Sequence, residues 1–335
     1  LRGLPLGSRF KAEFNTDTVR LRYDGITLLD GQLELGGQLA GELWLAGLLM
    51  DYYQQGRRLP GRGFDASYGE LQAFAKLNQP EHHHLSLVLG LRRWFLAAND
   101  STDPALTLPP DAWVFSPQLG YTYWRLHVDP AWDEWHRLFP RFTGFALGFD
   151  VRIDVRSATR PWGARDALVF ATPDLRNDPR TVGVLARQWL RLGVGLHRLL
   201  RLQVTQQAVL SSGVDDLNRV RVGGLNPYVV PVAGAPWAAF LSGRLLALEA
   251  SLHSQVGLGK LLELGLILDG VLLDDLSRTG RSDGGFMGGV GLFVDARWRG
   301  FQLDLRAGWC PTLDDQDAAG QLGVFGALGW QWDIR

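Results

Sequence analysis

The feature that most constrains this chain is a strict alternation of apolar and polar residues. Within residues 145–156 every odd position is apolar, and most even positions are charged. The apolar set is Phe145, Leu147, Phe149, Val151, Ile153 and Val155, and the charged set is Asp150, Arg152, Asp154 and Arg156. Because successive side chains of a β-strand point to opposite faces, such a segment has one apolar and one charged face. The pattern predicts an all-β fold.

The alternation continues along the chain to its C-terminal end. Strands are predicted near 18–29, 32–50, 67–77, 83–97, 113–128, 142–156, 163–171, 182–194, 198–210, 238–256, 261–273, 286–298, 301–310 and 321–334. The stretches 1–17 and 51–66 could hold two more strands. Many segments are about 10–15 residues long, whereas strands of soluble proteins usually have about 5–6 residues.

Two kinds of β-protein produce this alternation, and composition favours one of them. In a soluble sandwich or barrel the apolar face points inward, whereas in a membrane barrel it meets lipid and the polar face lines the lumen. Hydrophobic residues make up 46% of the chain and mean hydropathy is −0.04, yet the longest apolar run is Leu43–Met50, too short for a transmembrane helix. Tryptophan gathers near the strand ends, and many of the 41 glycines lie inside strands. We therefore expect residues 1–335 to form a single domain, a transmembrane antiparallel up-and-down β-barrel of 14–16 strands in the bacterial outer membrane.

Charge and cysteine content exclude other classes. The 34 Lys and Arg residues balance 35 Asp and Glu residues, so there is no electrostatic footprint for nucleic acid. The single cysteine, Cys310, excludes an intrachain disulfide framework and a cysteine-rich metal site. We expect no metal and no cofactor.

The lengths of the predicted links orient the barrel. Short links at 299–300, 257–260 and 195–197 alternate with longer ones at 274–285, 311–320 and 211–237. Outer-membrane barrels keep short turns on the periplasmic side and long loops outside. The last strand is therefore expected to end at the periplasm.

Four motifs occur in a fixed order in the C-terminal third of the chain, residues 211–335. The long loop 211–237 contains Arg219-Val-Arg221-Val-Gly223-Gly224-Leu-Asn-Pro-Tyr228. The other three are Ile267-Leu-Asp269-Gly270-Val271, the pair Gly289-Val-Gly-Leu292 and Gly300-Phe-Gln-Leu-Asp-Leu305, and a terminal Gly329-x-x-Trp332-x-Ile334. In this order the motifs resemble the bacterial surface-antigen or outer-membrane assembly-factor superfamily, which includes insertases and two-partner-secretion transporters.

The resemblance implies a sixteen-stranded, non-enzymatic barrel that inserts outer-membrane proteins or exports polypeptides. Its expected partners are outer-membrane lipid, other envelope proteins and a polypeptide substrate. Among its departures from the superfamily pattern, Arg221 is separated from Tyr228, so no compact Arg-Gly-aromatic element is formed, and the barrel-like alternation begins almost at once, without the usual periplasmic repeat domains. The alternative function is a structural barrel or passive pore that anchors a multi-protein envelope complex.

The resemblance also implies a first candidate site, a loop folded into the lumen. Asp269 falls on the polar, lumen-facing register of its strand, opposite leucines. A carboxylate in a confined lumen is stabilised by a guanidinium. We expect Arg221, or failing that Arg219, to pair with Asp269 and to hold loop 211–237, with its Gly223, Gly224 and Tyr228, inside the barrel. The alternative is two solvated charges in a wet pore.

The second candidate site is the seam between the first strand and residues 321–334. In the superfamily this junction pairs poorly and opens sideways. The last strand carries glycines that weaken a strand and permit kinking, and it ends in the assembly signal. The residues concerned are Gly320, Gly323, Gly326 and Gly329, with Trp332 and Ile334 in the signal. The alternative is that the glycines make room for bulky lumen neighbours.

Two further groups of polar residues have both a functional and a simpler structural explanation. His82, His83 and His84 could bind a metal, but only the outer two share a face of a strand. Ser251, His253 and Glu249 would suit an esterase, although polar strand neighbours more often form a polar wall.

Overall fold

The computed structural model describes most of the chain. The described residues are 9–15, 18–42, 49–50, 53–54, 57–58, 63–79, 82–100, 102–128, 142–164, 180–215, 217–225, 230–235, 240–256, 262–273, 285–298, 301–315 and 318–333. Within these ranges no helix is long and apolar enough to cross a membrane.

The chain is built from long strands joined by turns and loops. The long strands are β1 (Arg9–Asn15), β2 (Thr18–Leu28), β3 (Leu33–Glu42), β7 (Phe64–Gln79), β8 (His83–Ala97), β10 (Trp113–Val128), β11 (Phe142–Arg156), β13 (Val182–His197), β14 (Leu200–Ser212), β17 (Arg244–Val256), β18 (Leu262–Leu273), β19 (Phe286–Trp298), β20 (Phe301–Asp315) and β21 (Ala318–Asp333). The short ones are β4 (Leu49–Met50), β5 (Tyr53–Gln54), β6 (Arg57–Arg58), β9 (Leu106–Thr107), β12 (Gly163–Ala164), β15 (Val220–Val222) and β16 (Phe240–Ser242).

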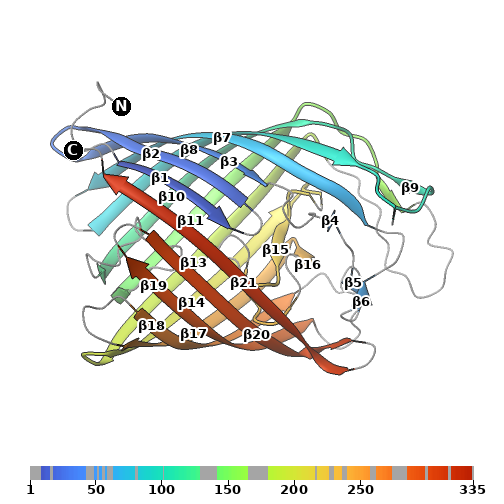
Figure 1. The fold of residues 1–335 in the computed structure, drawn as a ribbon. Helices are drawn as coiled ribbons and strands as arrows, with labels where there is room; N and C mark the ends of the chain where they lie inside the picture. The colour runs from blue at the N-terminus through green and yellow to red at the C-terminus, as the bar shows by residue number, and fades with distance from the viewer. Residues whose placement is uncertain are drawn as a thin grey trace.

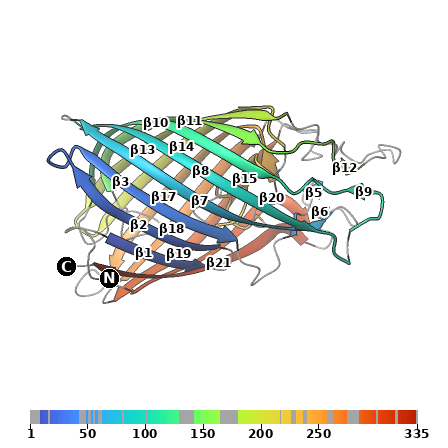
Figure 2. The ribbon, with the colours of Figure 1, turned by 90° about the horizontal axis from the view of Figure 1, so that it is seen from above.

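The long strands close into a barrel (Figures 1 and 2). They lie in one 15-stranded sheet, in which each pairs antiparallel with its neighbours in chain order. β1 pairs with β21, and β3 pairs with β7, so the sheet returns on itself. Leaving out the two-residue β4, the ring holds fourteen of these fifteen strands within the described residues. The expected all-β, antiparallel, up-and-down barrel of 14–16 strands is confirmed, at the lower end of that range.

Strand bounds agree closely with the alternation in the middle of the chain. The segments predicted at 83–97, 113–128 and 142–156 are the observed β8, β10 and β11. The strand predicted at 163–171 is not part of the ring, because β11 pairs directly with β13. Its first residues, β12, pair instead with β9 in a separate two-stranded sheet, and 165–171 lie outside the described residues.

The first and last described residues, Arg9 and Asp333, pair with each other and so lie at the same end of the barrel, as the ends of β1 and β21 show in Figure 1. The short turns 29–32 and 198–199 are at this end, and the longer links 98–112, 157–181 and 213–243 are at the other. By the rule for outer-membrane barrels, the terminal end faces the periplasm. We call the opposite end the external rim.

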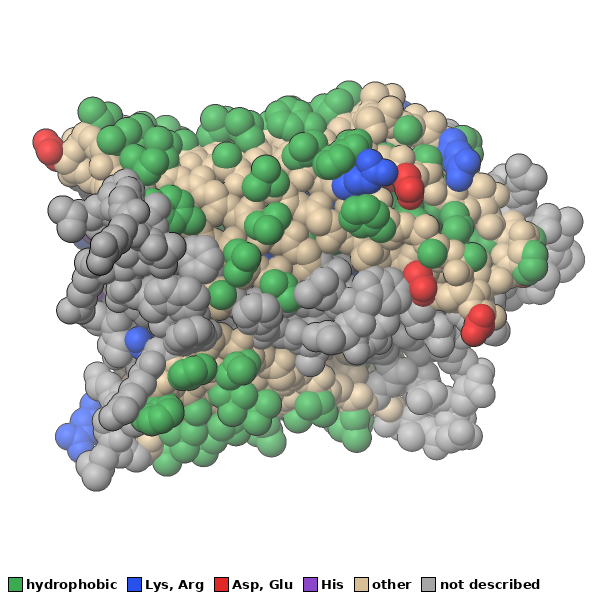
Figure 3. Space-filling view, turned by 45° about the horizontal axis from the view of Figure 1, so that its top comes forward, with side chains coloured by type: hydrophobic (Ala, Val, Ile, Leu, Met, Phe, Trp, Pro, Cys, Tyr) green, Lys and Arg blue, Asp and Glu red, His purple; other side chains and the backbone are tan. Residues whose placement is uncertain are grey.

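The outer surface of the barrel is apolar and the inner surface is polar. Along β8 the outward leucines at 85, 87, 89 and 91 are each 40–44% exposed, whereas the inward Trp94 is 2% exposed. Apolar side chains cover the face of the barrel in Figure 3, with few charges among them. Many buried polar residues point inward, among them Asp154, Glu263, Asp295 and Asp304. This polarity is the reverse of a soluble β-domain and is that of a barrel in lipid.

Candidate functional site: the lumen loop and the strand seam

The segment 213–243, which connects β14 to β17, folds back on itself. The short strands β15 and β16 pair at its base. Beyond them Gly223 and Gly224 have φ values of +113° and +83°, a left-handed conformation that glycine adopts without strain. The chain then returns, with backbone bridges from Val222 to Val230 and from Gly224 to Val232. This double turn presents the following segment, Ala233–Ala235, to the wall.

Asp269 holds this segment to the inner wall of the barrel. Its carboxylate accepts the main-chain N–H of Ala233, at 3.0 Å to Oδ1 and 2.8 Å to Oδ2. The side chain points inward from β18 and is only 7% exposed. A hydrogen bond to an ionised acceptor in a confined site is stronger than one between neutral groups.

A track of glycines on the wall makes this close approach possible. We call Gly289, Gly291, Gly308 and Gly323 the glycine track; they lie on β19, β20 and β21. A Cβ at Gly289 would overlap the main chain of Ala233, and one at Gly308 would lie 2.7 Å from the Ala233 Cβ. At Gly323 it would lie 3.3 Å from the Cα of Gly234, which itself has a φ of +82°. The wall therefore receives the loop backbone where side chains are missing.

Apolar side chains seal the loop against the strands. Val222, Val230, Val232 and Ala235 belong to one buried cluster with residues of six strands of the wall. The wall members are Leu185, Val209, Leu245, Ala247, Val271, Leu273, Met287, Cys310 and Leu313. Val222 and Val232 are fully buried. Burial of this kind stabilises the loop in the lumen by about 25 cal/mol for each Å² of apolar surface removed from water.

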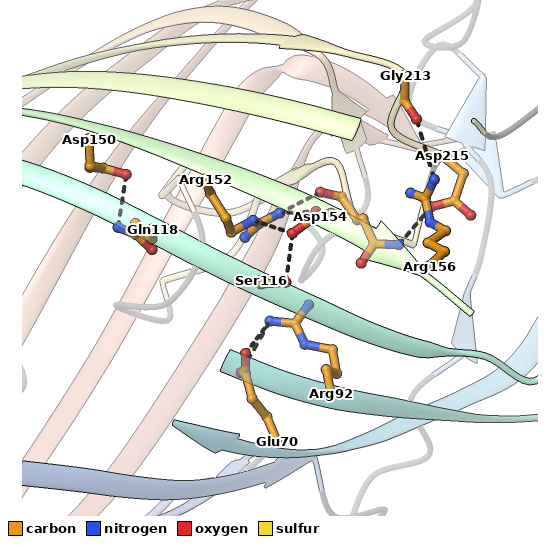
Figure 4. A network of polar contacts seen from close by, with 11 residues as sticks. Glu70, Arg92, Ser116, Gln118, Asp150, Arg152, Asp154, Arg156, Gly213 and Asp215 are labelled. Carbon is orange, nitrogen blue, oxygen red and sulfur yellow. Dashed lines mark hydrogen bonds and ion pairs between the residues drawn. The ribbon is translucent and has the colours of Figure 1, made fainter. Parts of the chain in front are cut away.

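A buried ion pair fixes the base of the loop (Figure 4). The Nη2 group of Arg156 on β11 donates a hydrogen bond to Oδ1 of Asp215 at 3.0 Å, and both side chains are almost fully buried. The Nη1 of Arg156 also donates to the carbonyls of Arg180 at 2.8 Å and Gly213 at 3.3 Å. Asn218 donates to the same Asp215 oxygen at 2.8 Å. The base is thus tied to both flanking segments.

The polar network continues along the inner wall. Arg152 donates to the carbonyl of Asn218 and pairs with Asp154, which also accepts the Ser116 hydroxyl at 2.7 Å. Arg92 pairs with both carboxylate oxygens of Glu70 at 3.1–3.2 Å. Of the contacts drawn in Figure 4, the Ser116–Asp154 and Arg92–Glu70 pairs cross neighbouring strands, whereas Arg152 and Asp154 lie on the same strand, β11. The ion pairs balance charges that the alternation places in the lumen.

The partner of Asp269 differs from the expected one. The sequence predicts Arg221 or Arg219 as its partner, and the loop group that contacts its carboxylate in the structure is the main-chain N–H of Ala233. The Arg221 guanidinium lies 5.7 Å from the ring centre of Trp94 on β8 instead. A peptide N–H fits between the glycines of the wall, where a guanidinium would need more space. Gly223 and Gly224 form the turn described above, and Tyr228 lies outside the described residues.

The seam between β1 and β21 is paired over less than half of β21. β1 has seven residues, which pair with Ala327–Asp333. β21 has sixteen, so nine of its residues, 318–326, extend beyond the described β1 and pair with β20. On this overhang Leu322 and Val324 are 85% and 83% exposed, whereas no other exposed apolar side chain of the described residues exceeds 66%.

The glycines of β21 have different surroundings. Gly320 has a φ of +87° and lies against the Trp309 ring, and Gly323 belongs to the glycine track. A Cβ added at Gly326 would make an ordinary van der Waals contact with Leu305, and one added at Gly329 would make such a contact with Gln302. In the assembly signal, the backbone of Trp332 pairs with Phe10, and Ile334 lies outside the described residues.

Ser251, His253 and Glu263 form a hydrogen-bonded chain lower in the lumen. Ser251 Oγ is 2.8 Å from Nε2 of His253, and Nδ1 of His253 is 2.8 Å from Oε1 of Glu263. Glu249, the partner considered from the sequence, lies opposite Asp269 in the β17–β18 register. The three side chains are at most 6% exposed. Gln203 lies opposite Ser251 on β14, and its amide donates to the Phe142 carbonyl. Because His253 lies on β17 and Glu263 on β18, we interpret the Ser251–His253–Glu263 hydrogen bonds as a cross-link between these two strands.

The histidines near residue 83 bind neighbouring side chains. His83 Nδ1 is 2.7 Å from the Tyr121 hydroxyl, and His84 Nδ1 is 2.8 Å from Oδ1 of Asn78. In the part of the chain that the structure describes, no group of three His, Cys, Asp or Glu side chains could hold a metal ion.

Comparison with known proteins identifies the fold. No protein-family model and no curated protein matches the sequence. Among solved structures, BamA from Haemophilus ducreyi lacking POTRA domains 1–3 aligns with a TM-score of 0.58 at 10% identity, over 97% of this chain and 70% of that one. CdiB from Escherichia coli aligns with a TM-score of 0.54 at 11% identity, over 99% and 64%, and CdiB from Acinetobacter baumannii with 0.53 at 10%, over 94% and 50%.

The chain therefore shares the β-barrel fold of these neighbours, although its ring holds fourteen strands within the described residues, whereas the resemblance implies sixteen. It spans one half to about two thirds of the length of these neighbours. Their fold is that of bacterial outer-membrane barrels, and the apolar outer surface described above places this chain in the same membrane.

Proposed function

We propose that this chain is a non-enzymatic outer-membrane barrel that inserts or exports polypeptides, by itself or as the barrel subunit of a machine with other envelope proteins. The fold shared with BamA and CdiB and the order of the C-terminal motifs support this class. The substrate would be an extended polypeptide, and outer-membrane lipid would surround the barrel.

The observation that carries the proposal is the overhang of β21. A strand edge that lacks a neighbour presents a row of N–H and C=O groups that another strand can pair with. Within the part of the chain that the structure describes, residues 318–326 have a strand partner on the β20 side only, and this edge lies next to the outward Leu322 and Val324. Nine residues match the about 9–11 residues of a membrane-spanning strand. A polypeptide strand that adds to this edge would satisfy its own backbone groups while it enters the bilayer.

The lumen loop supports the same proposal against a passive pore. The glycine track, Asp269 and the ion pair at the loop base attach the segment 213–243 to the wall at separate places. A loop held in this way restricts a continuous aqueous path. The route of the polypeptide would then be the seam, or the lumen after the loop has moved.

A reversible cross-link of the seam tests the proposal. Phe14 and Leu328 are directly opposite each other in the β1–β21 register. The pair Phe14→Cys with Leu328→Cys, in a Cys310→Ser background, should form a disulfide that holds β1 on β21. The matched control pair, Leu292→Cys with Ala307→Cys, joins β19 and β20 at directly opposed positions.

The assay uses proteoliposomes that contain the whole chain. Folding of an added urea-denatured outer-membrane barrel is followed by its heat-modifiable gel mobility, and export is followed by protease protection of an added unfolded polypeptide. We expect the oxidised seam pair to stop the activity and a reductant to restore it, while the control pair stays active. Absence of both activities in the unmodified chain, or full activity with the seam locked, would contradict the proposal.

A further inference from the structure

A small notch lies in the external rim, between the end of β14 and the start of β17. Its volume is about 300 Å³. It is lined by Ser211, Ser212, Gly213, Val214, Arg219, Gly243 and Arg244. The notch is separate from the glycine track, which lies on β19–β21, and from the seam, which lies between β1 and β21.

The lining of the notch is cationic and rich in hydrogen-bond donors. It includes two guanidiniums and two hydroxyls, and none of the seven lining residues is acidic. A Cβ added at Gly243 would lie 2.8 Å from Oγ of Ser211 and 4.0 Å from Cζ of Arg219. The Arg219 head group therefore lies beside Ser211 across a space that the missing side chain of Gly243 leaves open.

The notch lies at the upper edge of the lipid-facing surface. Leu210 and Leu246, just below it, point outward and are 63% and 46% exposed. Arg244 is itself exposed and pairs in register with Leu210. Two residues of a strand span about 7 Å, so Arg244 begins β17 about 7 Å along the strand from Leu246. The polar head-group region of a bilayer borders its hydrocarbon core, so a residue at the edge of the lipid-facing surface is near head groups.

We propose that the notch binds a phosphate group, the phosphate of an outer-leaflet glycolipid. Arginine presents a planar fork of donors that fits two oxygens of a phosphate, and serine hydroxyls can donate to a third. The acyl chains of the same lipid would lie against Leu210 and Leu246. The lipid would thereby be held where the lumen loop leaves the wall, close to the buried Arg156–Asp215 pair.

Binding of a defined lipid to the full chain tests this inference. The probes are bisphosphorylated lipid A, the same glycolipid with both phosphates removed, and inorganic phosphate, each titrated against the detergent-solubilised chain by native mass spectrometry. We expect Arg244→Gln to weaken binding of the phosphorylated lipid about tenfold or more, the effect of one lost charge-assisted contact. Gly243→Ala, which narrows the notch without changing charge, should weaken it as well.

The matched control is Arg198→Gln, which removes an exposed arginine at the periplasmic end of the same β13–β14 hairpin. Heat-modifiable mobility establishes that each variant is folded. Equal binding by Arg244→Gln and Arg198→Gln, or equal binding of the dephosphorylated lipid, would overturn the proposal. Inorganic phosphate that binds the chain as tightly as the lipid does would assign the notch to a free anion and would overturn the lipid assignment.

Discussion

The hydrogen bond from Ala233 to Asp269 makes the closed lumen sensitive to one carboxylate. Asp269→Ala removes the acceptor and leaves the Ala233 N–H buried against the glycine track without its partner. The backbone of the wall is unchanged, because Asp269 pairs with β17 and β19 through its main chain. The substitution should therefore release the loop from the wall without opening the barrel sheet.

The magnitude follows from the chemistry of the contact. One N–H shared between two carboxyl oxygens counts as one buried hydrogen bond, and removing the partner of a buried donor costs about 1–3 kcal/mol. Taking about 2 kcal/mol, the ratio of loop-out to loop-in states should rise about 30-fold, since 1.4 kcal/mol corresponds to a factor of ten. The desolvated N–H that remains in the closed state acts in the same direction.

Single-channel recording in planar bilayers measures this ratio as the fraction of time spent in a high-conductance state. The matched control is Asp150→Asn, an inward carboxylate that binds Gln118 and Arg187 on the wall and not the loop. Asp269→Ala should open the channel far more often than either the unmodified chain or the control. Equal open fractions for Asp269→Ala and the unmodified chain would refute the anchoring role of Asp269.

Three other outcomes are expected. Gly308→Val should also raise the open fraction, because its side chain would occupy the space of Ala233; an unchanged conductance pattern would show that the loop does not need the glycine track. Asp215→Asn should lower the free energy of unfolding in detergent by about 3 kcal/mol, since it leaves the buried Arg156 guanidinium without its counter-charge, and a urea titration that shows no shift would contradict this. A fluorophosphonate probe should leave Ser251 unlabelled, because its hydrogen bond to His253 belongs to a buried cross-link; stoichiometric labelling that His253→Ala abolishes would show instead that the group is a catalytic site.

The alternation was sufficient to predict the barrel because lipid imposes a period of two on every spanning strand. The segments 83–97, 113–128 and 142–156 could be bounded to the residue, since their apolar and charged faces change abruptly at each end. The segment 163–171 alternates but does not form a strand of the ring. Alternating residues in a loop can pair with another loop, as β12 pairs with β9. Register at the seam could not be predicted, since nothing in the alternation tells how far β1 reaches along β21.

The candidate site was predicted in place but not in chemistry. Register places Asp269 on the lumen face, and the superfamily resemblance implies that the loop after β14 folds onto it; in the structure Ala233 of that loop donates to Asp269. The partner could not be predicted, because a main-chain N–H leaves no trace in the identity of its residue. The signal that existed was the abundance of glycine on β19–β21, which indicates close approach of a backbone only after the fold is known.

The glycine track has a consequence for how such a loop can change over time. The wall contacts the backbone of the loop and accepts one of its N–H groups, so almost any small residue at position 233 would fit against the wall equally well. Substitutions in the loop are then tolerated, while substitutions of the track glycines are not, and the two surfaces are under unequal constraint. A barrel built in this way can keep its closed lumen while its loop sequence diverges beyond recognition, and a search for its relatives should therefore begin from the spacing of the wall glycines.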